Sequence, residues 1–501
     1  MVVCCLMDID RASLLSGVAE QFVAGERGMA CSSTSFVRCG LRVTARATEL
    51  WPSASILNRY SKTRKIMRKQ NSILALALLV GLVGSSSAAQ KSIEGHWEGV
   101  MVREGAELSV RFDFASAAAG LTASFNSPTQ RAMGIPLRKV SYTAPKVHFE
   151  LVGDATTIIF DGELTIDTIA GQFREGDARG TFSIRRVDAK PPTFKQEEVS
   201  FRNGDVTLSG TLLLPSTEAP HPAVVFLHGS GSDGRYAARF LAEYFTRHGI
   251  AALIYDKRGV GKSTGDWKRS DFNDLAGDAI AGIHFLQQRK EINPRKIGIY
   301  GHSQGCMIAP LIASQSRDVA FIVSGAGSAV PVYESEINSL TNQVRAKGIS
   351  GSELAEAIEF IKLEVNVSRT GQGWEQFDAA TEKARNAKWY PMLQVPAKNN
   401  WWWAFARRIY DYNAADYWAQ VSVPVLVIYG ERDLYVPVAQ TISNIDRALA
   451  KAKNGDYTIL VLPRASHAFN IEPEPGQPFE WWHMAPGFPD LLTAWINQRM
   501  K

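Results

Sequence analysis

The pentapeptide "GHSQG" at residues 301–305 is the part of the sequence that most clearly suggests a catalytic residue. The apolar run "KIGIY" before it predicts a strand, and "GCMIAPLIAS" after Ser303 predicts a helix. A serine on a tight strand-to-helix turn has its hydroxyl exposed above the sheet edge, where it can attack a carbonyl carbon. Gly301 and Gly305 leave room for such a turn, and the amino end of the helix favours a developing negative charge. The pattern therefore predicts that Ser303 is a nucleophile.

A serine nucleophile needs a histidine base, and the base needs an orienting carboxylate. After a serine on such a turn, the acid and then the histidine are expected in chain order. Only two histidines lie near the end of the chain: His467 follows the apolar strand "YTILVLP" on a short loop, whereas His483 lies away from any strand end. The strand "VPVLVIYG" before them is followed by Glu431 and Asp433. We predict that His467 is the base and Asp433 the acid, with Glu431 as the alternative acid and His483 as a structural residue.

The transition state of acyl transfer also needs hydrogen-bond donors for its oxyanion. The backbone N–H of Gln304, directly after the predicted nucleophile, is one candidate. The second donor is expected in "HGSGSDG", which follows the apolar run "AVVFL" and whose small residues let backbone N–H groups approach a ligand. We assign it to the N–H of Ser230, with the neighbouring Gly229 as the alternative.

Two glycine-rich segments allow a different interpretation, a nucleotide site. "GSGSDG" matches G-x-G-x-x-G after a strand, and Asp256 follows at about the distance of the acidic residue of a dinucleotide fingerprint. "GVGKST" resembles a phosphate-binding loop, but Asp256 stands where the first glycine of that motif should be. Because a complete serine, acid and histidine order follows in the same region, we favour the hydrolytic interpretation. No H-E-x-x-H motif occurs, so the sequence implies neither a cofactor nor a metal.

The elements that must position these residues follow an alternating pattern over residues 195–501. After a hairpin with a tight turn at Asn203 and Gly204, short Val/Ile/Leu-rich runs alternate with amphipathic helical segments. This alternation predicts an α/β fold with a mostly parallel sheet covered by helices on both faces. Residues 331–419 interrupt it with a helical pattern, so we predict a lid inserted between two strands. Their aromatic residues, including "WWWAF" at 401–405, suit either the core of the lid or the wall of an apolar pocket.

Residues 90–190 show a period of two instead of a helical period. In "LSVRFDF" every second residue is apolar, as in half-buried antiparallel strands. A small all-β domain, either a sandwich or a barrel, is therefore predicted before the α/β domain. "GHWEG" near its start resembles the G-x-W opening of lipocalin-like barrels, while Trp97 could equally be an ordinary core aromatic. Two prolines in "DAKPPTFK" mark the boundary between the two domains.

Residues 67–89 have the three parts of a secretory signal peptide. Two basic residues are followed by the uncharged, mostly apolar run 73–84, and small residues then precede a predicted cleavage site before Gln90. The apolar run is too short for a transmembrane helix, which needs about 20 residues. We therefore expect an exported protein, periplasmic or secreted, that keeps no stable membrane anchor after cleavage.

Residues 1–66 contain four of the five cysteines and no sustained apolar period. We predict that they are a mis-assigned extension before a true start at Met67, with a disordered tail as the alternative. The rest of the chain keeps only Cys306, which excludes a disulfide framework and cysteine-based zinc sites. Basic residues are in excess over residues 1–89 and balanced by acidic ones in the remainder. The charge therefore gives no argument for a nucleic-acid partner or for an anionic membrane surface.

Residues from about 197 to 501 resemble the α/β-hydrolase superfamily, in particular exported bacterial esterases and serine-aminopeptidase-like hydrolases. The segments that carry the resemblance are "HGSGSDGR", "DKRGVGKSTG", "GHSQG", "GERDLYVP" and "SHAF", in this order. The resemblance implies an α/β-hydrolase fold with a helical lid and a catalytic triad of Ser303, Asp433 and His467. The chain departs from the pattern at Cys306, where related sequences often continue with a glycine, and this departure concerns local packing.

The sequence thus predicts a serine hydrolase that forms an acyl-enzyme with a small-molecule substrate. A carboxylesterase is the first hypothesis, because the aromatic lid suits an apolar acyl or aryl group. An aminopeptidase-like serine peptidase is the second, and it would need a carboxylate for the substrate amine. Glu334 and Glu336 at the start of the lid are the candidates, unless they belong to a solvated surface. A third hypothesis of another class is an exported binding protein whose hydrolase domain is inert. The sequence does not indicate an oligomeric state.

Overall fold

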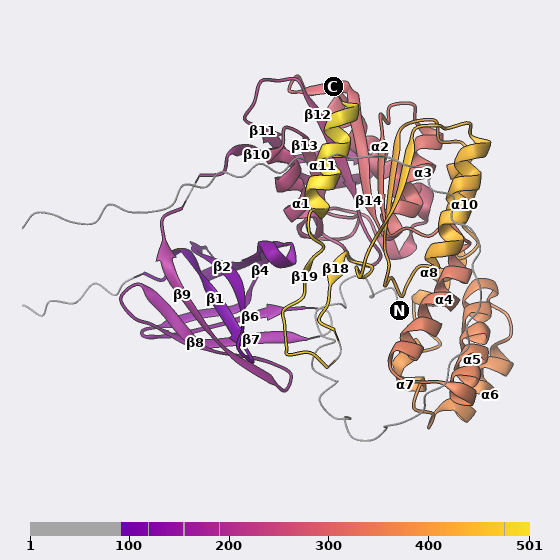
Figure 1. Ribbon diagram of the computed structural model, residues 1–501, viewed down its shortest axis with the longest axis horizontal. Helices are drawn as coiled ribbons and strands as arrows, with labels where there is room; N and C mark the ends of the chain where they lie inside the picture. Colours follow the sequence, from indigo (N-terminus) through magenta and orange to yellow (C-terminus); the bar gives the residue numbers. More distant parts are fainter. Residues whose placement is uncertain (1–91, 119, 154–155, 190, 475, 501) are drawn as a thin grey trace, which may run out of the picture. The chain divides into compact units, whose positions relative to one another are not determined.

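The computed structural model describes the chain from Ser92 to Met500 with four short gaps, as residues 92–118, 120–153, 156–189, 191–474 and 476–500. Two large sheets contain most of its strands (Figure 1). The predicted extension over 1–66 and the predicted signal peptide over 67–89 lie outside the described residues and stay predictions. Among the described helices, none combines the length and the apolar composition that crossing a bilayer requires.

The first sheet is entirely antiparallel and forms the predicted all-β domain. Its strands are β1 (Gly95–Arg103), β2 (Ala106–Ala117), β3 (Gly120–Ser127), β4 (Ala132–Pro136), β5 (Arg138–Thr143), β6 (Lys146–Val152), β7 (Thr157–Leu164), β8 (Thr168–Glu175) and β9 (Ala178–Val187). They pair in the order β4-β3-β2-β1-β9-β8-β7-β6-β5, and β5 also lies against β3. The sheet is therefore nearly closed, as in a barrel, and is not a two-sheet sandwich.

The interior of this sheet is filled with aromatic rings. The period of two in β2 places Phe112 and Phe114 inside, and Phe112 packs against Phe149 and Phe160 with ring centroids 5.1 and 5.6 Å away. Trp97 is fully buried among them, and its indole N–H donates to the carbonyl of Ile93 at 2.9 Å. Burial of large rings with a satisfied indole donor is the usual situation of a core aromatic. Trp97 is thus part of the hydrophobic core.

The second sheet has the mostly parallel arrangement that the sequence predicts. Its strands are β10 (Phe194–Asn203), β11 (Val206–Pro215), β12 (His221–Leu227), β13 (Ala251–Tyr255), β14 (Ile292–His302), β15 (Ile322–Gly325), β16 (Val425–Gly430) and β17 (Tyr457–Leu462). They pair in the order β10-β11-β13-β12-β14-β15-β16-β17. Only β10 with β11 and β11 with β13 are antiparallel. The predicted hairpin turn at Asn203 and Gly204 is confirmed, because Asn203 pairs with Val206 and Gly204 has a φ of 56°.

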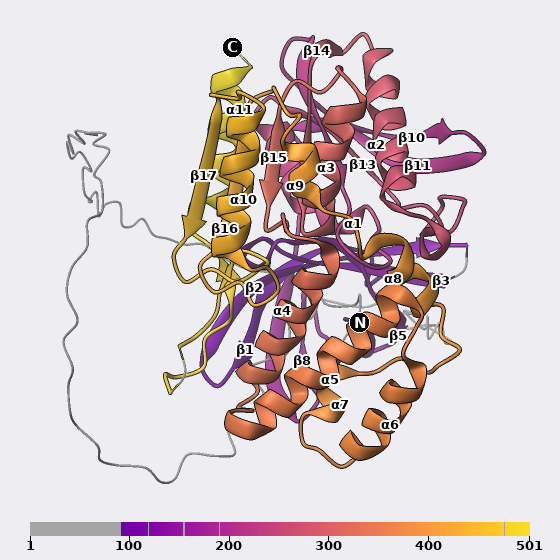
Figure 2. The same cartoon turned by 90° about the vertical axis from the view of Figure 1, so that its right-hand side faces the viewer.

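Helices cover both faces of the second sheet, as expected for strands that are apolar along their whole length. The helices are α1 (Tyr236–Arg247), α2 (Phe272–Gln287), α3 (Gln304–Gln315), α10 (Val438–Lys451) and α11 (Phe488–Arg499). One apolar cluster joins α1 and α11 to one face, and a second joins α2, α3 and α10 to the other. Figure 2 shows α2, α3 and α10 along the strands they cover. This is the predicted α/β-hydrolase architecture.

Six helices between β15 and β16 form the predicted lid. They are α4 (Val332–Ala346), α5 (Gly351–Thr370), α6 (Trp374–Ala384), α7 (Tyr390–Leu393), α8 (Trp402–Ile409) and α9 (Ala414–Trp418). In Figures 1 and 2, α4 to α7 group together beyond the ends of the sheet strands. Several lid aromatics pack on one another, among them Phe360 against Trp389 with ring centroids 5.4 Å apart. Part of the aromatic content of the lid is therefore its own core.

Candidate active site

Ser303 lies on the turn between β14 and α3, in the setting that the sequence predicts. Its φ of 54° and ψ of −118° belong to a conformation that non-glycine residues rarely adopt. The turn leaves no room for side chains beside it, because a Cβ on Gly301 would come within 2.5 Å of the backbone of Gly305. A Cβ on Gly305 would in turn lie 2.9 Å from the side chain of Leu227. The two glycines of "GHSQG" are therefore needed for the close approach of strand and helix.

Cys306, the departure from the expected glycine, is accommodated by a glycine on a neighbouring segment. Its side chain is buried, and Sγ lies 2.9 Å from the carbonyl oxygen of Gly301 and 2.8 Å from that of Gly325. A Cβ on Gly327 would come within 2.1 Å of the Cβ of Cys306. The side chain of Cys306 thus occupies the space that a side chain at position 327 would need, and the turn at Ser303 is not disturbed.

A chain of hydrogen bonds joins three of the predicted site residues. His467 Nε2 lies 3.0 Å from Ser303 Oγ, and His467 Nδ1 lies 2.8 Å from Asp433 Oδ2. The side chains of His467 and Asp433 are 4% and 0% exposed, so both are shielded from water. Asp433 Oδ1 accepts the backbone N–H groups of Tyr435 and Val436, which holds the carboxylate in place. A neutral His467 that donates Nδ1–H to Asp433 has its Nε2 lone pair free for the Ser303 hydroxyl.

The alternative acid and the second histidine do not join this chain of hydrogen bonds. Glu431 is exposed to solvent, and its Oε2 accepts the backbone N–H of Arg464 at 2.7 Å. His483 lies in the two-residue strand β19 (His483–Met484), which pairs with β18 (Asn470–Ile471). Of the two acids proposed from the sequence, the structure therefore brings Asp433 to the histidine.

His302, directly before the serine, contacts the histidine loop and was missed by sequence reasoning. Its Nε2 lies 2.9 Å from the carbonyl oxygen of His467, and the two rings are 5.2 Å apart. Burial, with a smaller effect of His467, lowers the pKa of His302 to about 3. The ring is therefore neutral and donates its N–H to the loop that carries His467. The residue occupies a variable position of G-x-S-x-G, and the sequence around it gives no signal of this contact.

The loop after β12 carries the predicted second oxyanion donor. The N–H of Gly229 donates to Asp233 Oδ2 at 2.8 Å, so this donor is already engaged within the loop. Ser230, the next residue, lines the same cavity as Ser303 and Gln304. Of the two candidates in this loop, Ser230 is thus the one that lines the cavity, whereas the N–H of Gly229 is engaged by Asp233.

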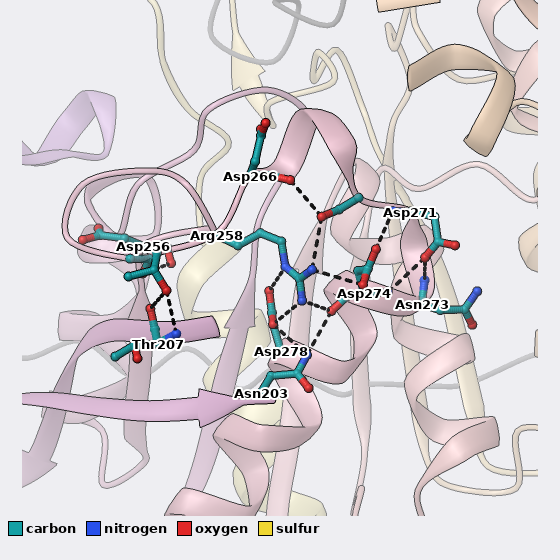
Figure 3. Close-up of polar contacts among 12 residues, drawn as sticks. Asn203, Thr207, Asp256, Arg258, Asp266, Asp271, Asn273, Asp274 and Asp278 are labelled. Atoms are coloured by element: carbon teal, nitrogen blue, oxygen red, sulfur yellow. Dashed lines mark hydrogen bonds and ion pairs between the residues drawn. The ribbon is translucent and has the colours of Figure 1, made fainter. Parts of the chain in front are cut away.

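The segment "DKRGVGKSTG" after β13 is held by two buried ion pairs. Arg258 makes two 2.7 Å hydrogen bonds to the carboxylate of Asp278 on α2 (Figure 3). Asp256 accepts three hydrogen bonds from Arg235, at 2.9 to 3.1 Å. Burial alone would raise the pKa of Asp256, but the hydrogen bonds from Arg235 outweigh it and lower the pKa. The acid of the nucleotide interpretation is therefore engaged by an arginine of the protein, as expected for a structural ion pair.

The cavity beside Ser303 has a volume of about 110 Å³ and is lined by residues of the sheet domain and of the lid. Its wall includes Ser230, Phe272, Ser303, Gln304, Met307, Ala326, Ser328, Val332, Ser335, Glu336, Ser339, Trp402, Ile409, Tyr410, Tyr435, Val436 and His467. The lid contributes both apolar side chains and one carboxylate to this wall. The pocket-wall interpretation of the lid aromatics thus holds for Trp402 and Tyr410.

The carboxylate in the wall is Glu336, and the other glutamate singled out from the sequence lies elsewhere. Val332, Glu336 and Ser339 share one face of α4 at helical spacing, and all three line the cavity. Glu334 is off this face and accepts the hydroxyl of Tyr333 at 3.0 Å. The spacing to Val332 and Ser339 distinguishes the two glutamates once the side of α4 that faces the cavity is known.

A buried carboxyl group, Glu364 of α5, lies near the half-buried Glu336. Glu364 is 2% exposed, and its Oε2 has no hydrogen-bond partner among the described residues. Burial raises the pKa of Glu336 to about 7, and burial together with the charge of Glu336 raises that of Glu364 to about 8. Burial and both carboxyl groups also raise the pKa of Tyr410. Glu336 in the cavity wall and the nearby Glu364 therefore lose their protons at higher pH than ordinary glutamates.

The raised pKa of Glu364 predicts that stability falls with rising pH. The folded chain keeps this proton up to about pH 8, whereas the unfolded chain loses it near the ordinary value of 4.5. The folded state thus binds more protons in this window, so the free energy of unfolding decreases as pH rises through it. Glu364→Gln is expected to flatten this decline, since its amide does not ionise. Melting temperatures from pH 5 to 9 measure it, with the exposed Glu356→Gln of the same helix as control. Equal slopes for all three proteins would contradict the assignment.

Comparison with known proteins identifies the family. Residues 218–474, just over half of the chain, match the family model described as "Serine aminopeptidase, S33". The chain belongs to this family. Together with the strand order of the second sheet, this match confirms the resemblance to the α/β-hydrolase superfamily.

Individual relatives are distant. The chain is 24% identical to Esterase EstD of Thermotoga maritima over 295 residues, which cover 56% of this chain and 64% of the relative. It is 30% identical to the quorum-quenching protein AidA of Acinetobacter baumannii over 128 residues, 25% of this chain and 42% of the relative. The chain thus spans less than two thirds of the length of either protein. The solved structure of the Pyrococcus furiosus esterase Pf2001 is 19% identical, with a TM-score of 0.40 over 63% of this chain and 95% of that chain.

Proposed function

We propose that this chain is a serine hydrolase that cleaves small carboxylic esters through an acyl-enzyme. The observation that carries the proposal is the buried chain of hydrogen bonds from the Ser303 hydroxyl through His467 to Asp433. A serine hydroxyl becomes a nucleophile when an adjacent imidazole can take its proton and a carboxylate orients that imidazole. The similarity to a relative named as an esterase supports an ester as the substrate.

The reaction follows from the positions of these groups. Ser303 Oγ attacks the ester carbonyl carbon, and His467 Nε2 takes the hydroxyl proton. The N–H groups of Ser230 and Gln304 receive the charge that develops on the carbonyl oxygen. The tetrahedral intermediate then expels the alcohol, which takes the proton from His467. Water, deprotonated by the same Nε2, cleaves the acyl-enzyme and releases the carboxylic acid.

The cavity favours a short acyl group. Its volume of about 110 Å³ is small beside the roughly 300–1,000 Å³ of pockets that hold drug-sized ligands. Phe272, Trp402 and Ile409 give it apolar walls close to Ser303. An acyl chain of a few carbons would bury its apolar surface there, whereas a long fatty acyl chain would require the lid to move.

A serine aminopeptidase is the second candidate, and Glu336 is the observation that favours it. A peptidase that releases an N-terminal residue must bind a free ammonium group, and a carboxylate in a pocket wall provides such a partner. Glu336 lines the cavity beside Ser303, and the family description also names aminopeptidases. Against it, an amide is a poorer acyl donor than an ester, so a peptidase must gain more binding energy in the transition state.

A substrate comparison decides between the two candidates. Short-chain nitrophenyl esters are expected to turn over readily and aminoacyl anilides hardly at all, because the cavity is small and mostly apolar. Glu336→Gln is then expected to leave kcat/KM for the esters within about threefold of wild type, since it replaces a carboxyl group of the same size. Glu334→Gln, on the same helix but outside the cavity wall, is the matched control.

The opposite pattern would favour the peptidase. In that case kcat/KM for an aminoacyl anilide would equal or exceed that for the esters. Turnover of the anilide would be lost in Glu336→Gln but kept in Glu334→Gln. No turnover of either substrate class, together with an unreactive Ser303, would favour the inert binding protein.

A further inference from the structure

Lys257 is a buried lysine whose ammonium group bridges the two segments that flank the candidate oxyanion site. It is 1% exposed and is the second residue after the end of β13. Its Nζ donates to the carbonyl oxygens of Gly229 at 2.6 Å and Gly231 at 2.8 Å, and to Gln304 Oε1 at 3.3 Å. One side chain therefore contacts the residues on both sides of Ser230 and also the residue after Ser303.

The two residues next to Lys257 in the sequence contact other parts of the chain. Asp256 binds Arg235, and Arg258 binds Asp278 on α2. These two ion pairs fix the backbone of the segment, so the lysine between them is held toward the oxyanion loop. A buried ammonium is costly unless several acceptors satisfy its protons, and carbonyl and amide oxygens supply them here. The ammonium group is thus satisfied by the segments that carry the two candidate oxyanion donors.

The geometry of the peptide unit links Lys257 to the N–H of Ser230. The Gly229 carbonyl and the Ser230 N–H belong to the same planar trans peptide and point to opposite sides of the chain. A hydrogen bond from Lys257 to the Gly229 oxygen therefore directs the Ser230 N–H away from the lysine. Ser230 itself lines the cavity with Ser303. Polarisation of the carbonyl by the ammonium also makes the N–H of that peptide a stronger donor.

We propose that Lys257 is a positioning residue for the oxyanion hole. It orients and polarises the Gly229–Ser230 peptide, and it holds the side chain of Gln304, whose own N–H is the second oxyanion donor. Lys257 acts through these amides and does not touch the substrate. The inference rests on the proposed function, because it requires a reaction in which a carbonyl oxygen becomes negatively charged.

The test compares wild type with Lys257→Met, which keeps an unbranched side chain of similar length but removes the donor. With a short-chain nitrophenyl ester, kcat is expected to fall about 10²–10³-fold, the loss seen when one oxyanion donor is removed, while KM changes little. The inhibition constant of a short-chain trifluoromethyl ketone is expected to rise by a similar factor, since its adduct with the serine carries an oxyanion. Lys262→Met, an exposed lysine of the same segment, is the control and is expected to match wild type.

A merely structural role would give another result. It would lower the melting temperature of Lys257→Met but leave kcat and ketone binding of the folded fraction near wild type, and that result would overturn the proposal.

If Lys257→Met does not fold, the same measurements are made on Lys257→Arg, whose planar guanidinium keeps the charge but not the ammonium geometry. A kcat for Lys257→Arg at least tenfold below wild type with unchanged KM supports the proposal, and a wild-type kcat overturns it. A wild-type chain that neither hydrolyses the ester nor binds the ketone would contradict the proposed function and this inference with it.

Discussion

Ser303→Ala and His467→Ala are each expected to lower kcat for a short-chain ester by about 10⁶-fold, the loss measured when the serine or histidine of such a constellation is removed. Without Ser303 Oγ no acyl-enzyme forms. Without His467 the hydroxyl keeps its proton and is a weak nucleophile. Because the two residues act as a unit, the double variant is expected to be no slower than either single variant.

Steady-state turnover of a nitrophenyl ester measures this effect. Ser314→Ala on α3 and His483→Ala on β19 are suitable controls, since neither side chain lines the cavity. Both are expected to keep kcat within about threefold of wild type, as for substitutions away from the reacting groups. Additive losses in the double variant of Ser303 and His467, or a single-variant loss below tenfold, would contradict a shared proton transfer between the two residues.

Asp433→Asn is expected to lower kcat by about 10⁴-fold, the loss seen when the orienting carboxylate of such a triad becomes an amide. The amide keeps the size of the side chain but can present a donor to His467 Nδ1. This favours the tautomer with the proton on Nε2, which cannot accept the Ser303 proton. The substitution also removes the negative charge that stabilises the imidazolium during the reaction.

Glu431→Gln is the matched control for this prediction, because Glu431 is a nearby acid that accepts a backbone N–H of Arg464 instead of a histidine. Its kcat is expected to stay near that of wild type. Single-turnover rates of acylation and deacylation would show whether both steps depend on Asp433, as the proposed mechanism requires. A larger loss in Glu431→Gln than in Asp433→Asn would transfer the role of the acid to Glu431.

Much of the fold could be predicted because buried strands, half-buried strands and helices differ in the spacing of their apolar residues. The strands β12, β13, β15 and β16 are buried on both faces and are mostly continuous apolar runs, whereas β2 has one buried face and alternates. The lid was recognisable as a helical interruption of this pattern. Whether the all-β domain is a sandwich or a barrel was not predictable, because both arrangements alternate along each strand. The difference lies in which strands meet across the sheet, here β3 and β5.

The residues of the hydrogen-bonded chain could be predicted because their positions follow from strand ends. Ser303, Asp433 and His467 each come shortly after a strand, and the carboxyl ends of parallel strands meet at one edge of the sheet. His302 and Lys257 could not be predicted in this way. Their contacts are with backbone carbonyls of other loops, and carbonyl positions depend on loop conformation rather than on residue type. Glu336 could have been separated from Glu334 only once the face of α4 that meets the cavity was known.

The measurement that tests the central claim most directly is covalent labelling with a fluorophosphonate, which reacts with serine hydroxyls activated by a neighbouring base. The wild-type chain and Ser303→Ala are treated alike, and the labelled residue is located by mass spectrometry of peptides. We predict one adduct per chain, on Ser303, in the wild type, and no adduct in Ser303→Ala. Equal labelling of the two proteins, or an adduct on another residue with Ser303 unmodified, would contradict the assignment of Ser303 as the nucleophile.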